Sequence, residues 1–73
     1  MPLTADMAND IAQKTGLKPT AVCLLETTMQ MSCFMRKQYD EDSVTAALVK
    51  QHGISEDKAR EFYRAFSETV NQQ

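Results

Sequence analysis

The sequence predicts an all-α fold: one domain over residues 1–73, with four helices arranged as two similar helical hairpins. Capping residues and apolar stretches of helical periodicity alternate along the chain, and a glycine follows two of these stretches. Strand signals are missing, because the chain has no alternating β-branched run and no Asn-Gly or Asp-Gly turn. A chain of 73 residues is long enough for one domain only.

The first hairpin consists of predicted helices over about residues 4–14 and 19–38. The Thr4 hydroxyl can cap the first helix, and Gly16 lies just past its end, where a positive φ stops a helix. Proline suits the first turn of a helix because it has no amide hydrogen to leave unbonded, so Pro19 marks the second start. Basic side chains complement the negative C-terminal end of a helix dipole, and Arg36 and Lys37 occupy that end.

The second hairpin consists of predicted helices over about residues 42–52 and 56–70. Either Asp40 or Asp42 can begin the third helix, and Gly53 ends it. Ser55 can cap the fourth helix, and Glu56 suits the positive end of its dipole. Both hairpins therefore have the same layout, in which a helix, a glycine and one apolar residue precede a longer helix.

Displacing the chain by thirty-seven positions superimposes the two hairpins. Glycine falls on glycine, and apolar residues coincide at Met7 and Val44, Ile11 and Leu48, Leu17 and Ile54, Val22 and Ala59, Leu25 and Phe62, Met29 and Phe66, and Cys33 and Val70. On the longer helices these positions are spaced by three or four, so they trace one face. We expect the two faces to form a common core with approximate pseudo-symmetry. Internal duplication and the chance alignment of two capped hairpins both remain open.

Size and cysteine usage favour a partner subunit. A domain this small buries about 60% of its unfolded surface, so a disulfide, a metal or a second subunit usually adds stability. Cys23 and Cys33 would lie about 15 Å apart along one helix, too far to form a disulfide. The single His52 has no companion for a zinc site. A partner subunit is therefore the remaining source of added stability that we expect.

The two cysteines and the N-terminal sequence also predict the cellular location of the protein. Unpaired cysteines and an N-terminus without an apolar signal-peptide core are typical of a cytoplasmic protein. No segment approaches the roughly 20 apolar residues that a membrane span needs, so no membrane partner is expected.

The stretch DIAQKTGLKPTAVCLLETTM, residues 10–29, resembles a helix-turn-helix, with Ala12 at the helix contact and Gly16 in the turn. The base-reading positions of that motif would fall on Lys18, Pro19, Thr20, Cys23, Leu24 and Thr27, which include one cation. Residues 5–37 also resemble the N-terminal helical hairpin of HU-type histone-like proteins, where it serves dimerisation. This resemblance implies pairing but no DNA-binding residues, because an acidic helical hairpin follows here instead of a basic β-ribbon.

The second predicted helix carries an apolar stripe besides its core face. The stripe comprises Leu24, Thr28, Met31 and Met35, with Phe34 beside it. The matching positions of the fourth helix are Glu61, Ala65 and Glu68, which predict a solvated face there. Methionine adapts to varied partner surfaces, so we expect a protein-binding face, most simply a two-fold homodimer interface of a regulator or adaptor. In the alternative, this helix is central, and the other three helices and Tyr39 enclose the stripe.

A DNA-binding transcriptional regulator is the second functional prediction. Its phosphate contacts, contributed by both subunits of a dimer, would be Lys14, Lys18, Thr20, Arg36 and Lys37. The net charge of −2, with acidic residues in excess after Tyr39, is not the basic footprint of a nucleic-acid binder, so protein binding is favoured. A small-ligand pocket between the hairpins is a third, less favoured alternative.

No catalytic, metal or cofactor site is expected. The chain shows no pairing of nucleophile and base, and both glycines are assigned to helix ends. Residues 40–42 lack the spacing of a calcium loop and fit a helix start instead. Glu26 is expected at the rim of the core in an ion pair with Lys or Arg, and His52 is expected to cap carbonyls of the third helix.

Overall fold

A computed structural model describes residues 4–36 and 40–71 and, within these ranges, the side chains of residues 4–31 and 40–71. Its four helices are α1 (Ala5–Thr15), α2 (Pro19–Arg36), α3 (Glu41–His52) and α4 (Glu56–Asn71). The all-α class is confirmed, and the described residues contain no strand. The observed ends of α1, α3 and α4 lie within one residue of the predicted ends. The predicted end of the second helix, at residue 38, lies outside the described residues.

Side chains at the helix starts satisfy backbone amides that have no partner within the helix. Thr4 Oγ1 accepts a hydrogen bond from the Met7 amide at 3.2 Å. Asp40 accepts one from the Ser43 amide at 3.0 Å and another from the Ser43 hydroxyl at 2.9 Å, which identifies Asp40 as the cap of α3. Ser55 Oγ accepts a hydrogen bond from the amide three residues on, at 3.1 Å. The predicted capping residues are confirmed.

Glycine ends both shorter helices. Gly16 and Gly53 have φ angles of 74° and 66°, and their amides donate to the carbonyls of Ala12 and Val49. This left-handed conformation costs glycine little, whereas a side chain with a Cβ would be strained there. The chain therefore turns at these two points because of a local property of the sequence.

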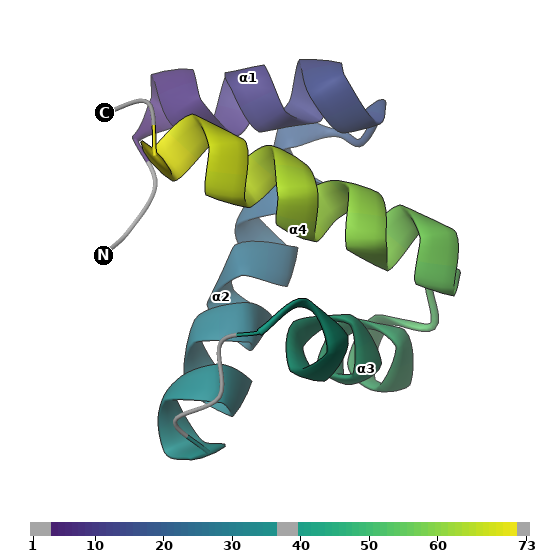
Figure 1. Ribbon diagram of the computed structural model, residues 1–73. Coiled ribbons are helices and arrows are strands. Elements are labelled where there is room, and N and C mark those ends of the chain that lie inside the picture. The colour runs from purple at the N-terminus through teal and green to yellow at the C-terminus, as the bar shows by residue number, and fades with distance from the viewer. Residues whose placement is uncertain (1–3, 37–39, 72–73) are drawn as a thin grey trace.

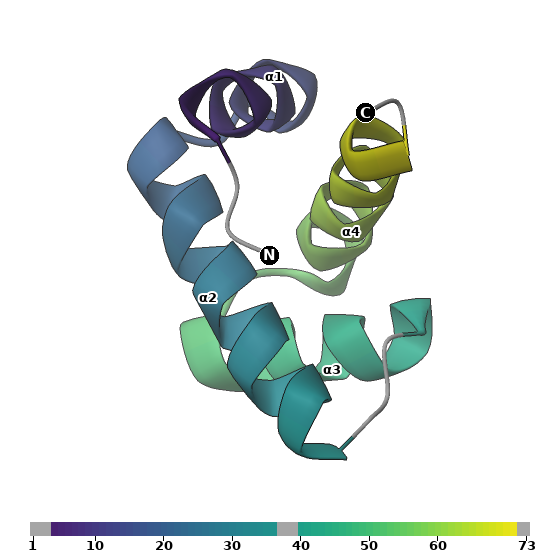
Figure 2. The ribbon, with the colours of Figure 1, turned by 90° about the vertical axis from the view of Figure 1, so that its left-hand side faces the viewer.

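The four helices pack in cyclic order: α1 on α2, α2 on α3, α3 on α4, and α4 on α1. Figure 2 shows α2 and α4 on opposite sides, with α1 above and α3 below them. In Figure 1, α2 runs from beside α1 at the top to beside α3 at the bottom. One side of α2 therefore faces the interior, and the opposite side faces away from the other helices.

The core occupies the space between the four helices. Its largest fully buried side chains are Phe62, Ile11, Leu48, Val22 and Val44. The inward face of α2 consists of Val22, Leu25 and Met29, and all three are buried. The helical periodicity predicts these positions on α2, and the predicted core residues Ala59 and Phe62 of α4 are buried as well. Val70, also predicted in the core face of α4, is instead 38% exposed, because it lies in the last turn of that helix. Cys33 lies outside the described side chains, and the pseudo-symmetry and duplication of the hairpins stay predictions.

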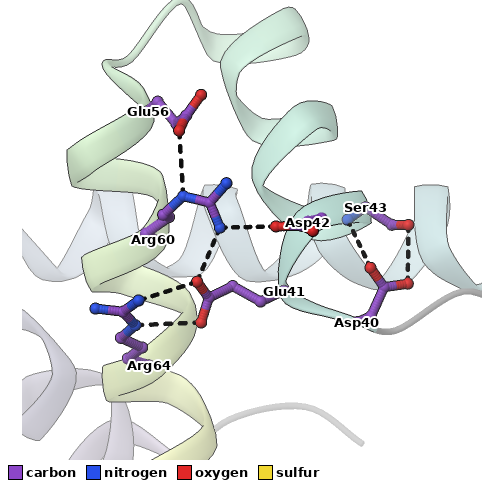
Figure 3. A network of polar contacts seen from close by, with 7 residues as sticks. All are labelled: Asp40, Glu41, Asp42, Ser43, Glu56, Arg60 and Arg64. Carbon is purple, nitrogen blue, oxygen red and sulfur yellow. Dashed lines mark hydrogen bonds and ion pairs between the residues drawn. The ribbon is translucent and has the colours of Figure 1, made fainter.

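Ion pairs connect the start of α3 to α4 (Figure 3). Arg60 Nη1 lies 2.8 Å from Glu41 Oε2 and 2.9 Å from Asp42 Oδ1, while its Nε pairs with Glu56 on the same helix at 3.2 Å. Arg64 donates hydrogen bonds of 3.1 Å and 3.2 Å to Glu41. Hydrogen bonds from Arg64 and Arg60 hold the pKa of Glu41 below its usual value. The acidic residues 40–42 therefore cap α3 and connect it to α4.

Candidate protein-binding surface

The outward side of α2 exposes two large apolar side chains. Leu24 is 63% exposed and Met31 is 66% exposed, whereas Met29 on the same helix is 5% exposed. Leu24 and Met31 are seven residues apart in the sequence. Two helical turns therefore separate them, and they lie on one side of α2, about 10 Å apart along its axis. The other helices do not enclose these two residues, in contrast to the alternative in which α2 is central.

Two exposed threonines extend this side of the helix. Thr20 lies one turn before Leu24, and Thr27 lies between Leu24 and Met31. The Thr27 hydroxyl donates a hydrogen bond of 2.9 Å to the Cys23 carbonyl of its own helix. Because this bond occupies the hydroxyl, Thr27 needs no polar partner when it is covered. We define the α2 outer face as Thr20, Leu24, Thr27 and Met31.

Thr28, which the sequence places in the stripe, makes a different contact. Its Oγ1 lies 2.5 Å from Nε2 of His52, in a hydrogen bond that joins α2 to the last turn of α3. Thr28 is half-buried as a result. The expectation that His52 caps carbonyls of its own helix is corrected, because the ring contacts α2. Thr27 takes the place of Thr28 on the outer face.

The α2 outer face carries no charge. Between Pro19 and Met31 the single charged residue is Glu26, which is 7% exposed and does not belong to this face. On α4, by contrast, Glu61 and Glu68 are exposed and pair with lysines at 3.0 Å and 3.3 Å. The two long helices thus differ as the sequence predicts at these glutamates. Ala65, also predicted in the solvated face of α4, is instead buried.

Glu26 lies in the interior rather than at the rim of the core. Its Oε1 has no hydrogen-bond partner, and no ion pair to it occurs among the described side chains. Burial away from water disfavours the charged carboxylate and raises the pKa of Glu26. The predicted rim position is therefore wrong, because neighbouring elements cover this side of α2 more completely than the periodicity indicates.

The predicted nucleic-acid contacts do not form a free basic patch in the described structure. Lys14 Nζ lies 2.9 Å from Asp10 Oδ2 and 3.3 Å from Glu68 Oε1, so acidic neighbours already compensate its charge. The hydrogen bond to Asp10 is also the main reason that the pKa of Lys14 is raised. Lys18 and Thr20 are exposed near the start of α2.

Several predicted residues lie outside the described side chains. They are Phe34 and Met35 of the predicted interface and Arg36 and Lys37 of the predicted nucleic-acid contacts. The backbone of residues 32–36 continues α2. The described part of the predicted interface is therefore Leu24, Thr28 and Met31.

The remaining described surface offers a depression along α4, which gives no indication of a ligand. A shallow depression along α4 is lined by Lys14, Asp57, Arg60, Glu61, Arg64, Ala65 and Glu68. Its three basic side chains form ion pairs within the chain. Across residues 4–31 and 40–71, no group of three or more His, Cys, Asp or Glu side chains could hold a metal ion. No helix in the described ranges is long and apolar enough to cross a lipid bilayer.

Comparison with known proteins found no family model, no curated protein and no solved structure that matches this chain. The resemblance of residues 5–37 to the HU-type hairpin stays a prediction. The function is therefore inferred from the geometry and charge of the described residues, above all from the α2 outer face.

Proposed function

We propose that this chain is a small protein-binding regulator or adaptor domain that forms a homodimer through the α2 outer face. The observation that carries the proposal is the exposure of Leu24 and Met31 on one side of an uncharged helix surface. Single exposed apolar residues are ordinary on protein surfaces. Two long ones at a two-turn spacing, with no charge between them, have the anchor spacing that helices use in protein recognition.

The opposite side of α2 supports this use of the helix. Val22, Leu25 and Met29 anchor α2 in the core, so its outer face is presented on a packed scaffold. A preorganised surface loses less conformational entropy when it binds. Burying a leucine or methionine side chain contributes about 1.5–3 kcal/mol before the costs of association. A homodimer uses each of these residues twice, once from each subunit.

Light scattering over a dilution series tests the proposal on the native chain and on the Leu24→Glu/Met31→Glu variant. We expect the native mass to rise from that of one chain toward that of two as concentration increases. The variant should stay at the mass of one chain, because pairing would bury unpaired carboxylates. Circular dichroism of both proteins checks that the exposed substitutions leave the helices intact.

Two results would contradict the proposed homodimer. One is a native chain that stays monomeric at millimolar concentration. The other is a variant that dimerises as strongly as the native chain. The matched control is Val70→Glu, because Val70 is an apolar residue of α4 that is 38% exposed and lies outside the α2 outer face. This control should dimerise like the native chain.

A further inference from the structure

Resting on the proposed function, we propose that the two α2 helices of the dimer pack antiparallel. The two-fold axis would pass beside Thr27. Leu24 of each subunit would then pack on Met31 of the partner subunit. In this arrangement a second copy of this chain covers the α2 outer face, and Leu24 and Met31 define the register in which it binds.

The absence of charge on the α2 outer face suits a second copy of this chain as the occupant. The described α2 outer face has no charged residue, and its large side chains are apolar. A partner with a charged binding surface would lose hydration there and gain no opposite charge in return. An identical α2 outer face brings no charge to the contact. The surface is therefore complementary to itself, as a two-fold interface requires.

The positions of the side chains define the register. Leu24 and Met31 flank Thr27 by three and four residues, so Thr27 lies near the midpoint of the two large side chains. Rotation about an axis at this midpoint exchanges the two ends of the face. Each leucine then meets a methionine, and the smaller threonine lies at the crossing, where the helix backbones approach most closely. The Thr27 hydroxyl is already bonded to the Cys23 carbonyl, so the crossing buries no unsatisfied hydroxyl donor.

Helix dipoles favour the antiparallel direction. In that direction the positive N-terminal end of one α2 lies beside the negative C-terminal end of the other. A parallel pair would place like ends together. The helix dipoles therefore disfavour the parallel pair.

A charge swap distinguishes the two directions. The variants are Leu24→Lys, Met31→Glu and the double variant that carries both, each measured by sedimentation velocity over a concentration series. We expect each single variant to weaken dimerisation at least about tenfold, because it buries a charge without a partner. In the antiparallel register the double variant places each new lysine against a new glutamate. It should therefore dimerise at least about tenfold more strongly than either single variant, with added salt weakening it.

The outcomes separate this inference from the proposed function. A native dimer that both single variants weaken, and that the double variant does not restore, would contradict the antiparallel register while keeping the α2 outer face as the interface. A native chain that never dimerises would overturn both proposals. Val70→Lys is the control for a new charge on another exposed apolar residue, and it should leave dimerisation unchanged.

Disulfide trapping gives a second measurement that does not depend on charge. In a Cys23→Ser/Cys33→Ser background, Thr27→Cys should form a covalent dimer on mild oxidation, because the two residues face each other across the axis. Thr20→Cys should not, since antiparallel packing places it two turns from the axis. Efficient trapping at both positions would indicate a parallel pair and contradict the inference.

Discussion

At the scale of single residues, Glu26 has an unusual environment for a carboxylate. A carboxylate on a helix flank commonly reaches water or a basic partner, but Glu26 is 7% exposed and its Oε1 has no hydrogen-bond partner. Burial away from water disfavours the charged carboxylate of Glu26. Desolvation therefore raises the pKa of this residue. The residue therefore makes the stability of the fold depend on pH.

Protonated Glu26 contributes to the stability of the folded chain at low pH, and this contribution is lost as the pH rises. Below the ordinary glutamate pKa of 4.5, Glu26 is protonated in both the folded and the unfolded chain, so folding buries no charged carboxylate. As the pH rises above 4.5, the unfolded chain releases the Glu26 proton first, because the pKa of this group is higher in the folded chain. The contribution of protonated Glu26 to the free energy of unfolding is then lost. We expect Glu26→Gln, relative to the native chain, to gain about 1 kcal/mol in the free energy of unfolding between pH 4 and pH 7.

Urea denaturation at a series of pH values measures this difference. The carboxylates with lowered pKa values, Asp10, Asp40 and Glu41, are hydrogen-bonded in the folded state and destabilise it as the pH falls. Their contribution is common to both proteins and cancels in the comparison. Glu68→Gln, at a glutamate whose side chain is 60% exposed, is the control without a buried carboxylate. A difference that does not change with pH would show that Glu26 is solvated.

At the scale of elements, the two hairpins depend on where their shorter helices stop. Gly16 and Gly53 both have positive φ angles, and a Cβ added at either would meet no atom within 4 Å. Substitution there therefore changes backbone strain without creating a clash. A substitution at either glycine therefore measures the free-energy cost of the left-handed backbone conformation without a contribution from a steric clash.

We expect Gly53→Ala to lower the free energy of unfolding by about 1 kcal/mol, because alanine is strained at positive φ. Gly53→Asn should cost less, since asparagine tolerates the left-handed region better than alanine does. Thermal and urea unfolding of the two variants and the native chain make the comparison. Equal stability of Gly53→Ala and the native chain would contradict a left-handed end of α3.

At the scale of the whole molecule, the distribution of charge favours a protein partner over nucleic acid. The net charge is −2, and α4 carries acidic residues among its basic ones. Lys14, one of the predicted phosphate contacts, already pairs with Asp10 and Glu68. Binding to duplex DNA would require releasing these pairs or relying on the remaining basic residues near α2.

A duplex titration at low and moderate salt tests this preference for a protein partner. We expect binding no tighter than about 10⁻⁴ M at moderate salt, with no loss on Lys18→Glu, because a weakly basic surface releases few counterions. The proper control is a Lys18→Gln variant, which removes the charge without reversing it. Steeply salt-dependent binding that Lys18→Glu abolishes would instead support the DNA-binding alternative.

Local sequence signals predict the four helices, the ends that the structure describes for α1, α3 and α4, and most of the core positions. Thr4, Asp40, Ser55 and the two glycines act on the backbone within a few residues of themselves, so their effect can be recognised locally. Helical periodicity likewise places Val22, Leu25 and Met29 on one side of α2 whatever packs against them.

The extent to which each helix is covered depends on the packing of the four helices and is not encoded locally. Periodicity gives the direction of a side chain around the helix axis, but burial depends on the distance and angle of neighbouring helices. Glu26 is enclosed, Thr28 is held by His52 from a distant part of the chain, and Leu24 and Met31 remain exposed. These outcomes depend on where elements far apart in sequence pack against α2 and where they do not, which local periodicity does not encode.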